Sequence, residues 1–469
     1  MADSFFALTL IIIYLLGFFC ASIALLTSRT PQGATAWVVG LITIPFITIP
    51  MFLVFGRSRF YGYTKRFKSI EKNINDRFIS MKGILDDYEK LDLKDIFSSL
   101  NPIMSPCFTS SNSIKLLKDA EFTYQLMLED LEKAKNYIIF QFYVFRPDAT
   151  GWRFAEVLMR KAKAGVKVYF LYDEIGSGIP NEFLEELISA GIEVCHFNSL
   201  SLKGRLQINF RNHRKILIVD GKMAYVGGLN IGDDYLGLWQ DLGEWRDTHI
   251  RLEGPSVLIC QLAHVKDWFW CQKKELNLDW RLLPSEQNAS VMVIPSGPAD
   301  EKQLCLLSHI CMINSAKSRL WIANPYLVPP DSLLDAILLA ALRGVDVKFI
   351  VPSYSDAWIV MIASQIYIKK LLQHGVKVYR YKKGFLHEKV ILVDNLFAVV
   401  GSANFDYRSM FINFEITVVA SEEKFINEVE EMLFVDISSS EEVQLSEFVN
   451  ESIWKKITTR AANLLAPIL

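Results

Sequence analysis

The sequence predicts an α/β protein built from two copies of one domain in a pseudo-twofold arrangement, preceded by a two-helix transmembrane hairpin. Three observations support this prediction: two long apolar runs near the N-terminus, an order of strand and helix patterns that recurs, and one polar motif that occurs twice. The 469 residues are enough for two or three domains. Their hydrophobic content of 51% exceeds the average of soluble proteins, which indicates that part of the chain lies in a membrane.

The predicted hairpin depends on two runs without a charged residue, 5–26 and 37–55. As a helix, each is long enough to cross the roughly 30 Å hydrocarbon core of a bilayer. A cleaved signal peptide is the alternative for the first run, although no basic flank precedes it, and a buried soluble hairpin is the alternative for both. Pro45 and Pro50 interrupt the second run, so we expect a kinked or tilted helix there.

The charges beside these runs predict the orientation of the chain. The segment between the runs holds only one basic residue, Arg29. Five basic residues follow the second run: Arg57, Arg59, Lys65, Arg66 and Lys68. By the positive-inside rule, the protein is expected to be multi-pass with its bulk in the cytoplasm. The basic cluster acts either as a stop-transfer flank or as a contact for anionic lipid headgroups.

The remainder of the chain divides into a connector and two similar domains. Residues 57–111 are expected to form a basic juxtamembrane segment and a helical connector, followed by domains at 112–290 and 291–469. The first domain has strand and helix patterns at 135–145, 151–165, 166–176, 181–191 and 192–197. The same order returns at 317–328, 332–344, 345–352, 364–375 and 376–381. Such a pair brings equivalent strand ends together at the domain interface, where ligand clefts commonly form.

A polar motif with the spacing His-x-Lys-x4-Asp occurs once in each domain. Its residues are His213, Lys215 and Asp220 in the first domain and His387, Lys389 and Asp394 in the second. After each aspartate come six residues and then a second match, Gly-Gly-Leu-Asn at 227–230 or Gly-Ser-Ala-Asn at 401–404. One such motif would be read as an ordinary surface pair. With only seven histidines in the chain, two matches with similar tails indicate a function.

The chemistry that this motif predicts is phosphoryl transfer. In each domain His and Lys are two residues apart in a β-rich run, so both project from one face. Two such pairs, facing each other, would hold phosphate oxygens with their lysines and place an imidazole on each side of phosphorus. One histidine would attack to give a phosphohistidine while the other protonates the leaving alcohol. Asn230, Ser402 and Asn404 are candidates to donate hydrogen bonds to the phosphoryl oxygens.

The carboxylates of the region divide into two kinds. Asp220 and Asp394 complete the motif and are counted with its catalytic residues, but each lies seven residues beyond its histidine. That odd number turns them to the other face of a continuous strand, so we expect them to hydrogen-bond the backbone of a turn. Glu415 and Asp247 are better candidates to orient the imidazoles, because a carboxylate on the far ring nitrogen fixes the tautomer.

The rest of the sequence predicts no cofactor, metal site or nucleic-acid partner. The seven cysteines form no Cys-x-x-Cys pair, which disfavours zinc and favours a reducing compartment, and the net charge of −2 provides no basic field for nucleic acid. Five histidines are expected in ordinary core or surface positions: His196, His249, His264, His309 and His374. Residues 451–469 form an amphipathic helix pattern whose apolar face either packs on the protein, the favoured interpretation, or lies in the membrane interface.

With its two His-x-Lys-x4-Asp motifs the sequence resembles the phospholipase D superfamily. More narrowly, it is similar to bacterial cardiolipin synthases with two transmembrane helices, through PQGATAW, QFYVF, RNHRKILIVDG, WRDTHIRLEGP, NPYLVPPD, LHEKVILVD and VGSANFDYRSMFINFE. The resemblance implies a metal-independent enzyme of the inner membrane that transfers a phosphatidyl group between two phosphatidylglycerols, giving cardiolipin and glycerol. It implies that His213 is the nucleophile, that His387 is the acid and base, and that Glu415 is the carboxylate of the family's Asn-x-Glu.

Other functions are compatible with parts of the same pattern. A membrane-bound phospholipase D hydrolase, or a phosphatidyltransferase with another alcohol acceptor, would keep every catalytic residue. A nuclease of the superfamily would require basic surface, which the charge and the hairpin argue against. A non-catalytic membrane scaffold would not require both motifs intact. The oligomeric state is left open.

Overall fold

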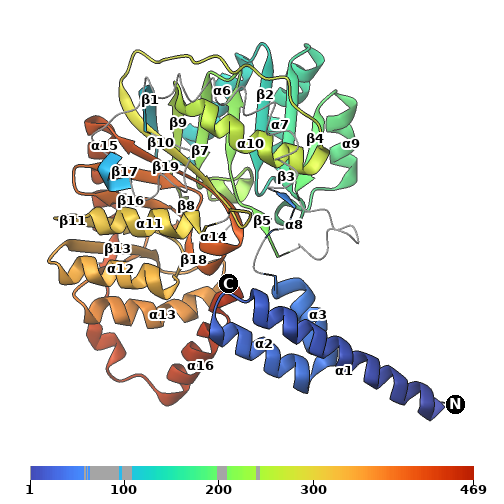
Figure 1. The fold of residues 1–469 in the computed structure, drawn as a ribbon. Coiled ribbons are helices and arrows are strands. Elements are labelled where there is room, and N and C mark those ends of the chain that lie inside the picture. Colours follow the sequence, from blue (N-terminus) through green and yellow to red (C-terminus); the bar gives the residue numbers. More distant parts are fainter. Residues whose placement is uncertain are drawn as a thin grey trace.

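The computed structural model describes residues 2–57, 60, 62–63, 94–97, 108–197, 209–238, 243–300 and 302–468. Two α/β halves share one sheet, and three apolar helices extend from them at the N-terminal end (Figure 1). Most of the predicted connector lies outside the described residues, as do Arg59, Lys65, Arg66 and Lys68 of its basic cluster; its described part includes the short helix α5 (Lys94–Phe97).

The first half runs from β1 to α10 and confirms the strand and helix patterns expected there. Its elements are β1 (Thr109–Leu117), α6 (Ala120–Glu132), β2 (Tyr137–Phe142), α7 (Ala149–Lys163), β3 (Lys167–Asp173), α8 (Glu174–Ser177), α9 (Asn181–Ser189), β4 (Glu193–Phe197), β5 (Arg211–Asn212), β6 (Ile216–Val219), β7 (Met223–Gly227), η4 (Asp233–Leu236), β8 (Glu244–Arg246), β9 (His249–Glu253) and α10 (Ser256–Gln272). Gly165 and Gly191, both at positive φ, follow the ends of α7 and α9, where a left-handed residue ends a helix most easily.

The second half runs from β10 to the C-terminus and repeats this order. Its elements are β10 (Ala289–Ser296), α11 (Leu304–Ser315), β11 (Arg319–Ala323), β12 (Leu327–Val328), α12 (Asp331–Leu342), β13 (Asp346–Pro352), α13 (Trp358–Gln373), β14 (Lys377–Tyr381), β15 (Gly384–Leu386), β16 (Val390–Val393), β17 (Phe397–Gly401), β18 (Phe405–Asp406), α14 (Tyr407–Phe411), β19 (Asn413–Ser421), α15 (Glu423–Ser438), β20 (Ser440–Glu442), η5 (Leu445–Phe448), α16 (Ile453–Asn463) and η6 (Ala466–Ile468).

The strand order shows the internal symmetry directly. The sheet reads β20-β14-β13-β11-β16-β17-β19-β10-β1-β9-β7-β6-β2-β3-β4. Outward from the antiparallel pair β10 and β1, the two halves have equivalent strands in the same order, and β20 adds an edge to the second half. The outer strands β2, β3 and β4 are parallel to one another, as are β11, β13 and β14. The sequence duplication is therefore a pseudo-twofold repeat about the β1–β10 pair.

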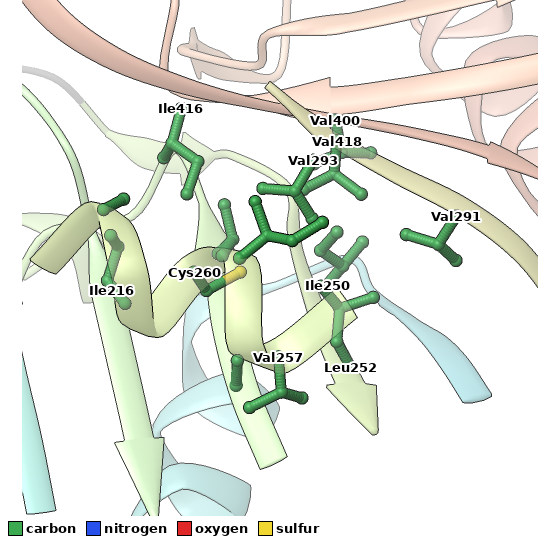
Figure 2. Close-up of a cluster of buried hydrophobic side chains, with 14 of the residues drawn as sticks. Ile216, Ile250, Leu252, Val257, Cys260, Val291, Val293, Val400, Ile416 and Val418 are labelled. Atoms are coloured by element: carbon green, nitrogen blue, oxygen red, sulfur yellow. The ribbon is translucent and has the colours of Figure 1, made fainter. Parts of the chain in front are cut away.

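The centre of the sheet is a hydrophobic core to which both halves contribute. Figure 2 shows its buried side chains on β9, β10, β17, β19 and α10: Ile250, Leu252, Val257, Cys260, Val291, Val293, Val400, Ile416 and Val418. Because strands of both halves pack into this one cluster, the halves are joined by continuous apolar contact. Their relative position, which sets the geometry between them, is therefore fixed by packing.

The membrane segment agrees with the prediction in its first helix and differs in its second. α1 (Ala2–Thr27) has 26 residues, about 39 Å at 1.5 Å per residue, and is apolar enough to cross a bilayer. The second apolar run is not one helix: it forms α2 (Pro31–Thr43) and α3 (Pro45–Phe55), separated at Ile44. Pro45 has no N–H to continue α2, so the helix ends there rather than kinking. The expected single kinked span is thereby corrected to two short helices.

The C-terminal helix α16 also differs from the favoured expectation. It packs on α13 through its polar side, where Thr459 is buried and Asn463 accepts a hydrogen bond from Tyr367. The apolar side faces outward: Trp454 is 73% exposed and Leu464 is 81% exposed. The apolar face of α16 therefore does not pack on the protein but is available to the membrane interface.

Candidate active site

Each histidine of the repeated motif is placed by a strand that pairs with the other half of the molecule. β5 leads into His213 and pairs in parallel with the start of β19, which carries Glu415. β15 leads into His387 and pairs in parallel with β8, which ends just before Asp247. The main-chain N–H of His213 donates to a β19 carbonyl at 2.9 Å, and that of His387 to a β8 carbonyl at 2.7 Å. The two motifs therefore meet at one pseudo-twofold site between the halves.

The imidazole of His213 is oriented by Glu415 of the second half. Its Nδ1 lies 3.0 and 3.1 Å from the two carboxylate oxygens, which leaves Nε2 to face a substrate. Three side chains donate hydrogen bonds to the same carboxylate: Ser402 Oγ at 2.5 Å, Ser409 Oγ at 2.8 Å and Asn413 Nδ2 at 3.3 Å. Glu415 is fully buried, so this network both satisfies its charge and fixes its position.

The imidazole of His387 is oriented by Asp247 of the first half. Its Nδ1 lies 2.7 Å from Asp247 Oδ2, and Oδ1 accepts the main-chain N–H of Thr248 at 2.8 Å. Gly228 occupies the position equivalent to Ser402, and a Cβ there would lie 2.0 Å from Asp247 Oδ1. The first half thus combines a shorter carboxylate with a glycine, and the second half a longer one with a serine. The two histidine sites are equivalent in position but different in detail.

Each lysine lies against its own histidine. Lys215 Nζ donates to the main-chain oxygen of His213 at 2.7 Å, and Lys389 Nζ donates to that of His387. Both lysines are buried. Burial lowers the pKa of Lys215 to about 7 and that of Lys389 to about 8, against the opposing effect of the carboxylates nearby. A buried cation without a bound anion is costly, so these ammonium groups favour an anionic ligand.

The remaining charges leave neutral imidazoles at neutral pH. Burial lowers the pKa of His213 to about 4 despite Glu415, and burial together with Lys389 lowers the pKa of His387 despite Asp247. Burial alone would raise the pKa of Glu415, but His213 and Lys215 outweigh it and hold that pKa below its usual value. A neutral imidazole with an ionised carboxylate on Nδ1 has a free lone pair on Nε2, as nucleophilic attack requires.

The two motif aspartates lie in turns, away from the imidazoles. Asp220 and Asp394 have φ of 53° and 49°, and each follows the last residue of β6 or β16. Asp220 accepts the main-chain N–H groups of Lys135, Asn136 and Tyr137 at 2.7 to 2.9 Å, and Asp394 those of Lys317, Ser318 and Arg319 at 2.7 to 2.9 Å. The expected turn bracing is confirmed. Each carboxylate thereby fixes the start of β2 or β11.

Three predicted phosphoryl donors have other partners. Asn230 Oδ1 accepts from the main chain of Val144 at 3.0 Å, and its Nδ2 donates to Tyr235 at 2.9 Å. The hydroxyl of Ser402 donates to Glu415, as described above. The side chain of Asn404 hydrogen-bonds Asp406, whose pKa this contact lowers against a larger effect of burial. In this structure each of the three side chains has a partner within the protein.

Aromatic rings that the sequence analysis did not select lie against both imidazoles. The ring of Tyr143 is 4.9 Å from that of His213, and the ring of Trp245 is 5.1 Å from that of His387. Tyr326 lies 6.4 Å from His387, at the position equivalent to Tyr143. QFYVF and NPYLV place these two tyrosines alike in the repeat, a signal from which they could have been found.

The described residues show no other candidate centre of this kind. Among them, no group of three or more His, Cys, Asp and Glu side chains could hold a metal ion. The histidines expected to be ordinary are buried at His249, His264 and His309, and His196 is an exposed partner of Glu174. The reactive groups that the structure brings together are therefore His213, Lys215, His387, Lys389 and the two carboxylates.

Comparison with known proteins agrees with this geometry. Residues 127–243 and 309–434 match the family described as "Cardiolipin synthase, PLD-like domain". The chain is 38% identical to cardiolipin synthase A of Pseudomonas aeruginosa, over 100% of this chain and 97% of that protein. It is 37% identical to cardiolipin synthase A of Pseudomonas syringae, over 99% of this chain and 98% of that protein.

The fold also has a counterpart among solved structures. A phosphatidylserine synthase of Haemophilus influenzae aligns with a TM-score of 0.63 over 80% of this chain and 99% of that one, at 14% identity. That likeness concerns the fold alone. Together with the full-length relatives and the family match over both halves, it accords with two motifs in one pseudo-twofold site. The chain belongs to the phospholipase D-like cardiolipin synthase family.

Proposed function

We propose that this protein is a cardiolipin synthase, which transfers a phosphatidyl group from one phosphatidylglycerol to another and releases glycerol. The observation that supports this most directly is the crosswise site: each half supplies a histidine and a lysine, and each imidazole is oriented by the carboxylate of the other half. We propose domain boundaries at 112–290 and 291–469, which place one motif in each domain.

In the first step, His213 attacks the phosphorus of the donor lipid. The Nε2 lone pair forms a P–N bond as the P–O bond to the headgroup glycerol breaks. His387, protonated in the bound complex, gives its proton to the glycerol oxygen. The anionic phosphodiester raises the pKa of His387, which is low in the empty site, and thereby favours the protonated form. Glu415 stabilises the positive charge that develops on His213.

In the second step, the two histidines remain on opposite sides of the phosphorus, and the acceptor lipid takes the place of glycerol. Neutral His387 takes the proton from a headgroup hydroxyl of the second phosphatidylglycerol, and that oxygen attacks phosphorus as the P–N bond breaks. Lys215 and Lys389 hold the phosphoryl oxygens in both steps. We assign the nucleophile to His213 because its carboxylate accepts three side-chain hydrogen bonds besides the imidazole, which holds the attacking ring more firmly.

The substrates and the apolar helices place the enzyme at a membrane. We propose the bacterial inner membrane, with the catalytic halves on the cytoplasmic side, because the basic residues follow the apolar segments. The exposed apolar face of α16 would lie in the same interface and contact anionic lipid through Lys455, Lys456 and Arg460.

The test is purified protein in detergent with phosphatidylglycerol and no added metal, with lipid and water-soluble products separated. We expect equal amounts of cardiolipin and glycerol. Phosphatidic acid as the sole lipid product would favour a phospholipase D hydrolase and overturn the synthase. The donor lipid is labelled at phosphorus, and the reaction is stopped without acid. Label should be retained on the wild-type protein and absent from His213→Ala. Unchanged activity in His213→Ala or His387→Ala would overturn the two-histidine mechanism.

A further inference from the structure

We infer that α2 and α3 form a re-entrant hairpin that enters and leaves the bilayer on the side of the catalytic halves, so that only α1 crosses the membrane. Two full spans would place the α1–α2 turn and the catalytic halves on opposite sides. In the structure they touch.

The turn between α1 and α2 is fastened to the second half. Arg29 Nη2 donates to the main-chain oxygen of Phe411 at 2.8 Å, and its guanidinium lies 4.7 Å from the Phe411 ring centre. A polar cavity of about 440 Å³ lies between the turn and this half, and its lining includes Ser28, Lys302 and Asn413. A cavity lined by polar groups is expected to lie in contact with water rather than within the hydrocarbon of the bilayer. The beginning of α2 is therefore on the catalytic side.

The chain returns to the same side after α3. Five residues beyond the end of that helix, Phe60 is 3% exposed and lies 5.3 Å from the ring of Phe210 and 5.2 Å from that of Phe414. Its main-chain N–H donates to the oxygen of Pro298 at 3.2 Å. Both ends of the α2–α3 pair are thus held by the catalytic halves.

Between these ends the two helices fold back on each other. The rings of Trp37 on α2 and Phe52 on α3 are 5.3 Å apart, whereas two residues separated by that much sequence in one straight helix would be roughly 22 Å apart. Phe52 is buried in a cluster with Ala21 and Ala24 near the end of α1. The C-terminal end of α3 therefore lies beside the C-terminal end of α1, which is the end nearer the catalytic halves.

The tip of the hairpin reaches only the middle of α1. α2 has 13 residues and α3 has 11, about 20 and 17 Å of helix, and neither spans a roughly 30 Å hydrocarbon core. A Cβ on Gly17, near the middle of α1, would lie 2.5 Å from the oxygen of Leu41, so glycine permits the close approach there. The rings of Tyr14 and Phe46 are 6.4 Å apart at the same level.

The tip is suited to hydrocarbon. Phe46 is 51% exposed and Ile47 is 63% exposed, and residues 30–56 include no charged side chain. Main-chain oxygens beside the helix break are paired within the hairpin, as lipid requires: the oxygen of Gly40 accepts the N–H of Ile44 at 2.9 Å, and that of Ile44 accepts the N–H of Thr48 at 3.1 Å. Thr48 Oγ1 lies 2.8 Å from the oxygen of Gly40 and 2.7 Å from that of Ile44. An aqueous turn on the far side of the membrane would not require this internal satisfaction.

The basic residues agree with a single crossing. The first 28 residues contain no Lys or Arg, whereas Arg29 and the cluster that begins at Arg57 follow α1. With one crossing, all of them lie on the cytoplasmic side, as the positive-inside rule favours. With two crossings, Arg29 would lie on the outer side, which the rule disfavours.

The test is the accessibility of single cysteines in the full-length protein. In a variant lacking the native cysteines, Ser4→Cys and Gln32→Cys are exposed to a membrane-impermeant maleimide in intact cells and after permeabilisation, with Lys317→Cys in the second half as the matched cytoplasmic control. We expect Ser4→Cys to react in intact cells, and Gln32→Cys and Lys317→Cys to react only after permeabilisation. Reaction of Gln32→Cys in intact cells, or protection of Ser4→Cys there, would overturn the inference.

If the cysteine-free variant fails to fold, a second measurement uses the native sequence with an added epitope tag. An epitope tag placed before Met1 of the native sequence should be removed by protease from intact spheroplasts, while a tag inserted after Gln32 should survive until the membrane is opened. Survival of the first tag or loss of the second would contradict a single crossing.

Discussion

Replacing Glu415 with glutamine removes the charge that orients His213 while keeping the shape of the side chain. The hydrogen bonds around Glu415 determine which tautomer of His213 the variant favours. Ser409 and Asn413 both donate to Oε1, so the amide oxygen of the variant belongs there and its NH2 group takes the place of Oε2, 3.0 Å from His213 Nδ1. The NH2 group donates, so Nδ1 must accept and the ring proton moves to Nε2. The atom that should attack phosphorus then carries a hydrogen.

The expected loss is large because the wrong tautomer cannot attack. In hydrolases whose histidine is oriented by a carboxylate, the same change costs about 10⁴ in kcat. Glu415 is fully buried, and Ser409 and Asn413 still donate to the Oε1 position, so we expect a loss of about 10³ to 10⁴, or roughly 4 to 5 kcal/mol of transition-state stabilisation. KM should rise as well, because the Glu415 charge opposes the lowering of the Lys215 pKa, and its loss favours the neutral lysine that cannot hold the phosphate.

The assay is initial cardiolipin formation from phosphatidylglycerol in detergent micelles, with wild type and Glu415→Gln compared at several lipid fractions. Glu415→Asp is the matched control, because it keeps the charge and should recover part of the rate. Thermal unfolding of all three proteins separates a catalytic loss from a folding defect. A kcat for Glu415→Gln within tenfold of wild type would refute the assigned role of the carboxylate.

Three further predictions concern the turn, the lysines and the glycine beside the second imidazole. Asp394→Asn should keep kcat within about threefold but reduce the stability of the fold by roughly 1 to 3 kcal/mol, measured by thermal unfolding, because its carboxylate accepts main-chain hydrogen bonds. With pKa values of about 7 for Lys215 and about 8 for Lys389, kcat/KM should fall as pH rises through this range, since the lysines lose the charge that binds the phosphodiester; Lys215→Arg should move the fall to higher pH in the same profile. Gly228→Ala should lower kcat by about 10²-fold without loss of folding, because its methyl would displace Asp247; wild-type kinetics in that variant would contradict the close contact.

Features that repeat in the chain could be predicted from the sequence, and features that depend on contacts between distant segments could not. The duplicated motif and the parity of its residues predicted paired histidines and lysines and turn-bracing aspartates. Parity could not indicate that Glu415 serves His213 while Asp247 serves His387, because that pairing arises where β5 meets β19 and β15 meets β8. Likewise the side-chain amide of Asn230 is suited to a phosphate, but its hydrogen bonds are made with Val144 and Tyr235.

The membrane segment shows a second limit of a linear pattern. Hydropathy counts apolar length, and 37–55 is long enough for a span. It does not register that Pro45 can end one helix and begin another in the opposite direction. The apolar face of α16 was ambiguous for a similar reason: the spacing predicts one apolar face, and only the neighbouring α13 decides that Thr459 is covered and Trp454 is not.

The crosswise pairing of imidazoles and carboxylates has a genetic consequence. A substitution in one half should impair the histidine of the other half. Asp247 variants should share the phenotype of His387 variants, and Glu415 variants that of His213 variants. Neither motif can change independently, because each histidine depends on a carboxylate encoded in the other half.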